Sequence, residues 1–179
     1  MNAKGFTLIE AIVATSVFAV AATSIVGVYA SIQRLNRQSS ALQALEQNVR
    51  FVGGELTKII EAGKIDYASY AAGTVAQPFT TDLYLRDHNQ TQLRIFKSGD
   101  FLALEKAGVG TANLTGREIK VLNFRLYIWP ATNPFPEGPA TPKEQPTVTI
   151  YVELQSNLGG ENPSLMTFQT TIATREYPQ

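Results

Sequence analysis

The chain of 179 residues contains no cysteine, so it forms no disulfide and offers no thiolate to a metal. Its single histidine, His88, leaves little for a zinc site or a histidine-based triad. Asp82, Asp87 and Asp100 lack the alternating acidic spacing of a calcium loop. Lys and Arg equal Asp and Glu at 15 each, which disfavours nucleic acid as the primary partner. These shortages predict a protein that is not an enzyme, with no catalytic residue, cofactor or metal site.

Charge is also missing from a long N-terminal segment. No Asp, Glu, Lys or Arg occurs between Ala11 and Gln33. This run is longer than the ~20 residues that a helix needs to cross a bilayer. Glu10 stands at its start, where a carboxylate is costly unless it finds a partner. The sequence therefore marks Glu10 as a candidate functional residue.

The junction Lys4-Gly5-Phe6-Thr7-Leu8-Ile9-Glu10 resembles the processing site of type IV pilins and type II secretion pseudopilins. In that family, a prepilin peptidase cuts a short basic leader between the glycine and the phenylalanine and methylates the new N-terminus. The resemblance implies a leader of residues 1–5 with Lys4 as its basic residue. It also implies a cut between Gly5 and Phe6, N-methylation of Phe6, and a role for Glu10 in filament assembly.

A secretory signal peptide or a simple membrane anchor is the alternative for this N-terminus. Ala19-Val20-Ala21 could serve as a signal cleavage site. The acidic residue at the start of the apolar run, the continuation of that run and the helical pattern beyond it all count against this alternative. Because Arg34 and Arg37 follow the span, the distribution of basic residues does not by itself orient it, and orientation rests on the resemblance.

A helical pattern continues beyond Gln33. Its apolar residues are Leu35, Leu42, Leu45, Val49, Val52, Leu56 and Ile59, spaced from Leu42 onward by alternating steps of three and four. No proline precedes Pro78, so one helix is predicted from Phe6 to about Ala62, with Gly63 as its stop. The stripe predicts packing against a sheet or, alternatively, a coiled-coil seam, which Gly53-Gly54 weakens because glycines loosen a helix.

After about Thr81 the apolar period changes from helical to two, the period of strands. Strands are expected at 83–86, 92–97, 101–105, 119–129, 147–155 and 165–175. Residues 64–81 are expected to form an irregular connector, and 107–116 a glycine-rich loop. The fold class predicted is α+β and pilin-like, with one long helix packed on a single half-buried antiparallel sheet.

The same patterns divide the chain into parts. Residues 6–33 would be the membrane and filament-core half of the helix, 34–62 its amphipathic half, and 63–179 the β-sheet head. The head contains a proline-rich loop at 130–146, which is either a solvated connection or a contact surface. In the second case Trp129 and Phe135 are the candidate partner contacts.

In the head, the resemblance is greatest to minor pilins of the W type and minor pseudopilins of the J type. It implies a structural subunit of a type IV pilus or type II secretion pseudopilus that helps initiate assembly or forms the tip. The implied partners are prepilin peptidase, other pilin subunits, an inner-membrane assembly platform and, before assembly, the lipid bilayer. The implied location is the bacterial inner membrane, single-pass with the head outside the cytoplasm, and then the filament. The alternative is a membrane-anchored binding module, such as an adhesin or a DNA-capturing tip subunit.

Overall fold

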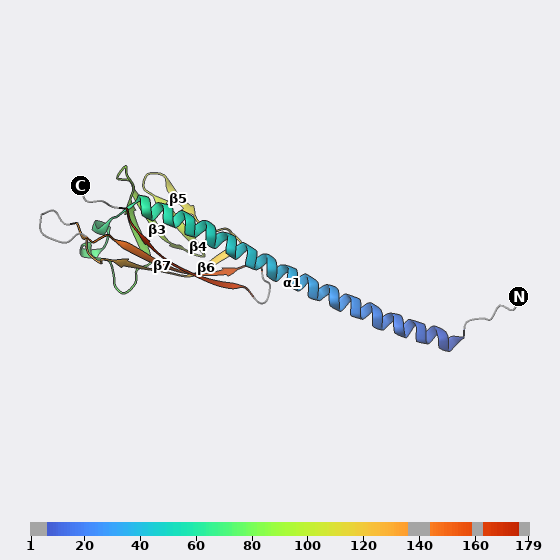
Figure 1. Ribbon diagram of the computed structural model, residues 1–179. Helices are drawn as coiled ribbons and strands as arrows, with labels where there is room; N and C mark the ends of the chain where they lie inside the picture. Colours follow the sequence, from blue (N-terminus) through green and yellow to red (C-terminus); the bar gives the residue numbers. More distant parts are fainter. Residues whose placement is uncertain (1–6, 136–143, 159–162, 176–179) are drawn as a thin grey trace. The chain divides into compact units, whose positions relative to one another are not determined.

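The computed structural model of the chain describes residues 7–135, 144–158 and 163–175. Contacts divide the chain into two compact units, residues 1–39 and 40–179. The helix α1 (Leu8–Ala62) provides the first unit and continues as the first element of the second (Figure 1). It ends one residue before Gly63, where the sequence predicts a stop.

Strands and two short 3-10 turns follow the helix in the second unit. In chain order they are β1 (Lys64–Ile65), η1 (Tyr67–Ser69), η2 (Ala71–Gly73), β2 (Asp82–Arg86), β3 (Gln92–Ser98), β4 (Phe101–Lys106), β5 (Gly110–Asn113), β6 (Ile119–Trp129), β7 (Thr147–Ser156) and β8 (Leu165–Ala173). All the neighbouring strands pair antiparallel. The predicted strands are present, with ends that differ from prediction by a residue or two.

The strands form two sheets rather than the single sheet that the sequence predicts. The first sheet has the order β1-β2-β3-β4-β5 and the second the order β6-β7-β8. β1 lies in the segment predicted as an irregular connector, and β5 lies in the segment predicted as a loop. Both were missed because they are too short, at two and four residues, to show a period of two.

The helix packs on both sheets through one stripe. Its buried residues are Ala41, Leu45, Val52, Leu56 and Ile60. The last four share one core cluster with residues of both sheets, such as Leu83 of β2 and Ile150 of β7. This layout confirms the predicted fold class. Two details differ: Leu42 is 44% exposed, while Val49 and Ile59 are only half-buried.

The register of β6 differs from the simple alternation that its sequence suggests. A bulge between Val121 and Asn123 interrupts the pairing with β7. Val121 is therefore buried together with Phe124, Leu126 and Ile128, while Leu122, expected to point inward, is half-buried. An inserted residue shifts the alternation by one position, which a sequence pattern reveals only as an irregularity.

Three contacts fix the C-terminal half of α1 on the sheets. The Asn48 side chain accepts a hydrogen bond from the Gly116 N–H at 2.9 Å and donates one to Glu118 at 3.3 Å. Gly53 faces the ring of Phe168, and a Cβ at position 53 would lie 3.1 Å from the ring atom Cζ. Gly53, expected to loosen the helix, is thus a point of close packing.

Candidate functional site

Thr7 and Glu10 form a reciprocal cap at the start of α1. The Glu10 N–H donates to Thr7 Oγ1 at 3.3 Å, and the Thr7 N–H donates back to Glu10 Oε2 at 3.2 Å. The Thr7 hydroxyl also donates to Oε2 at 3.1 Å. This is a capping box, in which two otherwise unpaired backbone N–H groups are satisfied by side chains. Glu10 Oε1 accepts no hydrogen bond from the described residues.

Large apolar side chains cover the first unit on all sides of the helix. Leu8, Ile9, Phe18 and Ile25 are each at least 70% exposed. By length and composition, α1 is the one helix in the described part of the chain that could cross a membrane. Such a surface requires lipid or protein around it, because exposing contiguous apolar area to water is unfavourable.

The hydroxyl groups of this segment are satisfied within the helix itself. The Ser and Thr hydroxyls from Thr15 to Ser31 each donate to a carbonyl three or four residues earlier, as Thr15 does to Ala11 and Ser24 to Val20, both at 2.8 Å. Thr23 and Ser31 make equivalent bonds to Ala19 and Gly27. These Ser and Thr residues therefore carry no unpaired hydroxyl into an apolar environment, and Glu10 is the one Asp, Glu, Lys or Arg between Thr7 and Gln33.

The predicted processing residues Lys4, Gly5 and Phe6 lie outside the described residues. The two predicted partner contacts lie in the second unit. Trp129 ends β6 and is 50% exposed, whereas Phe135 is half-buried and its N–H donates to Asn133 Oδ1 at 3.0 Å. No ring contact joins these two described residues. Residues 136–143 of the proline-rich loop lie outside the described residues.

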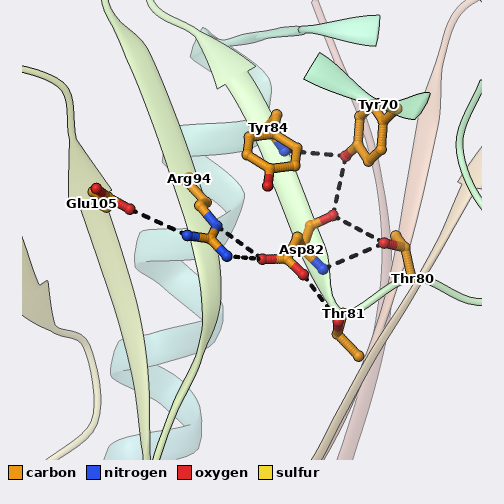
Figure 2. Close-up of polar contacts among 7 residues, drawn as sticks. All are labelled: Tyr70, Thr80, Thr81, Asp82, Tyr84, Arg94 and Glu105. Carbon is orange, nitrogen blue, oxygen red and sulfur yellow. Dashed lines mark hydrogen bonds and ion pairs between the residues drawn. The ribbon is translucent and has the colours of Figure 1, made fainter. Parts of the chain in front are cut away.

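The outer side of the first sheet holds a cluster of polar residues centred on Arg94. Figure 2 shows its guanidinium between Asp82, at 2.7 Å, and Glu105, at 3.6 Å. The hydrogen bond to Asp82 raises the pKa of Arg94 above its usual value. The Tyr70 hydroxyl donates to the Asp82 carbonyl and accepts from the Tyr84 N–H, each at 3.1 Å. Both carboxylates are paired with one cation, so the cluster links β2, β3 and β4 and contains no free general base.

Burial raises the pKa of the Tyr70 hydroxyl well above its usual range, while the hydrogen bond from Tyr84 opposes that shift. Tyr70 therefore remains a neutral hydrogen-bonding group. Asp82, Asp87 and Asp100 do not converge on one point, because their carboxylates pair with Arg94, Lys106 and Lys120 respectively. Among the described residues, no group of three or more His, Asp or Glu side chains is placed to hold a metal ion.

A groove of about 510 Å³ lies on the outer face of the second sheet, and sequence reasoning did not identify it. Its lining residues are Phe79, Asn123, Arg125, Tyr127, Thr149, Tyr151 and Gln169. The Arg125 guanidinium lies 5.8 Å from the centre of the Phe79 ring. The strand residues of the lining occupy solvent-facing positions of β6, β7 and β8. Phe79 comes from the connector before β2, and only the tertiary structure brings it here.

Comparison with protein-family models finds the prokaryotic N-terminal methylation motif at residues 1–26. No curated protein and no solved structure matches the chain. The α+β layout, with one long N-terminal helix packed on antiparallel sheets, is pilin-like, and by length and composition that helix could cross a membrane. The methylation motif indicates the type IV pilin and pseudopilin family. It points to a structural subunit that is processed by prepilin peptidase and assembles with other pilins.

Proposed function

We propose that this chain is a minor pilin or minor pseudopilin, of the W or J type, that helps initiate filament assembly at the tip. The observation that carries the proposal is the methylation motif at residues 1–26, continuous with an exposed apolar helix. Residues 1–5 are the leader and 6–33 the membrane and filament-core segment. Residues 34–62 connect this segment to the head, 63–179. The chain is anchored in the inner membrane with the head outside the cytoplasm, and an assembly platform then moves it into the filament.

Glu10 has a specific role in this transfer. When the apolar segment leaves lipid and packs among equivalent helices, the carboxylate becomes a buried charge that needs a counter-charge. The new amine of Phe6 in a neighbouring subunit supplies one after the leader is cut. The capping bonds use Oε2, and since no described residue donates to Oε1, this second oxygen can accept from that amine. Since an unpaired buried charge is strongly penalised, pairing selects one axial register between neighbouring subunits.

The experiment that tests the function is the mass of the N-terminal peptide from native membranes, with and without the prepilin peptidase. We expect a peptide that begins with N-methylated Phe6 and that is absent without the peptidase. An intact leader, or a start after Ala21, would contradict the proposal. An intact leader would indicate a membrane-anchored protein, and a start after Ala21 would indicate a secreted one.

A second candidate function, a membrane-anchored binding module, is favoured by the groove on the second sheet. Its lining combines the aromatic side chains of Phe79, Tyr127 and Tyr151 with planar polar groups, and no carboxylate lines it among the described residues. Pockets that combine apolar walls with a few polar groups are typical of ligand sites. Trp129 lies on the same face, two residues after Tyr127 in β6. This function adds adhesion or DNA capture to the filament role.

Replacing Tyr151 by alanine separates the two functions. For a binding module, we expect Tyr151→Ala filaments to form at normal levels but to lose adhesion or DNA uptake. The matched control is Thr167→Ala, on the same face but outside the groove lining. If adhesion and DNA uptake are both normal in filaments of the Tyr151 variant, the groove has no ligand role.

A further inference from the structure

The second sheet has two edges that differ in their protection. β6 and β8 are its outer strands, and β7 lies between them. β8 has nine residues with the sequence LMTFQTTIA, which contains no charged residue and no proline. Edge strands are usually short, or carry charges and prolines, because an open row of backbone N–H and C=O groups can pair with another chain. β8 has none of these protective features.

The directions of the backbone groups of β8 follow from two hydrogen bonds at the ends of its ladder. The Ser156 N–H donates to the Ser164 carbonyl at 2.9 Å, and the Thr174 N–H donates to the Pro146 carbonyl at 3.0 Å. In an antiparallel pair, alternate residues direct both backbone groups to the neighbouring strand. The even-numbered residues of β8 therefore bond to β7. The odd-numbered residues face the open side: Leu165, Thr167, Gln169, Thr171 and Ala173.

Within the described residues, no hydrogen bond is made to the open side of β8 between Leu165 and Ala173. The first hydrogen bond on this side lies just beyond the strand, where the Arg175 N–H donates to the Glu61 carbonyl at 3.3 Å. On the core side of β8, Met166 and Phe168 are only half-buried. The core is therefore thinner along this edge than under β7, where the inward-facing side chains are buried.

The opposite edge of the same sheet is closed by bonds from other segments. Thr80 exchanges two backbone hydrogen bonds with Leu126, at 2.8 and 2.9 Å. The Gln77 side chain donates to the Ile128 carbonyl, and Lys97 donates to the Leu122 carbonyl, each at 3.2 Å. The end strands of the first sheet are short, with two residues in β1 and four in β5. β8 is thus the one long open edge in the part of the chain that the structure describes.

We propose that the open edge of β8 is a docking site for an extended strand from a different subunit of the same filament. Backbone groups in this arrangement accept a strand and little else, because the partner must offer donors and acceptors at the same repeat. The added strand would also cover the half-buried Met166 and Phe168. The inference rests on the proposed filament function.

A different polypeptide fits better than a second copy of this chain. In a head-to-tail contact between copies, β8 of one copy would have to pair with a different edge strand of the next copy. The end strands of the first sheet, β1 and β5, are only two and four residues long, too short to pair along β8. A symmetric pairing of two β8 strands is the remaining arrangement between copies. Such a pairing would give a closed dimer and not a filament contact, and hydrogen exchange together with the mass in detergent distinguishes it.

Hydrogen exchange of the full-length processed chain tests the edge directly, in detergent and in isolated filaments. In detergent we expect alternating protection along β8, with slow exchange at Phe168 and Thr170 and fast exchange at Thr167, Gln169 and Thr171. In filaments the three fast amides should become slow. Fast exchange in assembled filaments would overturn the proposal. Protection already present in detergent, together with a dimeric mass, would assign the edge to a second copy and would also overturn it.

A matched pair of variants at Thr167, which lies outside the groove lining, tests the same edge by function. Thr167→Pro removes a backbone donor on the open side without removing a bond to β7, whereas Thr167→Ala keeps that donor. We expect Thr167→Ala to enter filaments normally and Thr167→Pro about tenfold less, the effect of losing one hydrogen bond of ~1.4 kcal/mol. Thermal unfolding of both variants checks that the head is folded, and Thr171→Pro replaces Thr167→Pro if it is not. Equal incorporation of the proline and alanine variants would contradict the proposal.

The mass of the N-terminal peptide distinguishes a failure of the docking edge from a failure of the proposed filament function. A methylated Phe6 N-terminus with normal entry of Thr167→Pro into filaments would overturn the docking edge alone. An intact leader with no filament entry would overturn the filament function itself, and the docking edge with it.

Discussion

Glu10 combines a local role with a proposed intermolecular role, and the two can be separated through Thr7. Both residues take part in the capping box, but only Glu10 carries a charge. Loss of a cap costs about 1 kcal/mol, whereas an unmatched register would prevent assembly. We expect Glu10→Ala to be cleaved normally but poorly incorporated into filaments, and Thr7→Ala to be incorporated nearly normally. The amount of each variant in sheared filaments, relative to the processed protein in the membrane, is the measurement. Equal incorporation of the two variants would show that Glu10 acts only as a helix cap.

Asp87 illustrates how one carboxylate fixes a turn in the head. Its Oδ1 accepts the N–H groups of Asn89 and Thr91, both at 2.9 Å, and its Oδ2 lies 3.3 Å from Lys106 Nζ. Desolvation acts to raise the pKa of Asp87. The hydrogen bonds from Thr91, Lys106 and Asn89 outweigh it and hold the pKa below its usual value.

A pH dependence follows from this lowered pKa. The folded-state pKa lies below the unfolded one, so the stabilisation is present above about pH 4 and is lost as pH falls through the folded pKa. We expect Asp87→Asn to lower the melting temperature at neutral pH and to match the wild type in strong acid. Thermal unfolding across this pH range is the measurement. A difference that does not change with pH would show that the charge of Asp87 contributes nothing.

At the scale of elements, the contact between α1 and β8 depends on the absence of a side chain at Gly53. A Cβ there would lie 3.1 Å from the Phe168 ring, whereas a Cβ at Gly54 would meet nothing within 4 Å. Alanine is favoured over glycine by about 1 kcal/mol inside a helix. We expect Gly54→Ala to raise the free energy of unfolding by about that amount and Gly53→Ala to raise it less, because the ring must move.

Chemical denaturation of the two variants measures this difference. In a Phe168→Leu background the ring is absent, so we expect the two alanine substitutions to become equivalent. Equal stabilisation by Gly53→Ala and Gly54→Ala in the wild-type background would show that the Phe168 ring moves aside without a cost in free energy. In that case the glycine at position 53 is not needed for packing.

At the scale of the whole molecule, the chain combines an apolar helix that cannot remain in water with a head that has its own core. Residues 40–179 form a compact unit with fully buried side chains from α1 and both sheets, among them Leu56, Leu83 and Ile150. We expect a shortened chain of residues 37–179 to be soluble and monomeric and to unfold cooperatively, as small single domains do. Thermal unfolding followed by circular dichroism, with light scattering for the mass, is the measurement. Aggregation or a gradual transition would show that the head depends on the preceding segment.

Features that depend on neighbouring residues along the chain could be predicted from the sequence. The uncharged run after Glu10, the helical stripe through Leu45, Val52 and Leu56, and the alternation in β7 are all local periodicities. They were sufficient to predict the long helix, most of the strands and the fold class. The resemblance of residues 4–10 to a pilin processing site agrees with the methylation motif at residues 1–26. The roles of Glu10, Trp129 and Phe135 remain predictions.

The choice of neighbouring strands, by contrast, depends on the folded chain as a whole. A period of two shows that a segment is a strand, but the choice of partner depends on hydrogen bonds between residues far apart in the sequence. The division into two sheets, the pairing of the short β1 and β5, and the place of Phe79 beside Arg125 therefore could not be derived from local patterns. The same holds for the contrast between the closed edge of β6 and the open edge of β8, since β6 is closed by Gln77, Thr80 and Lys97 from other parts of the chain.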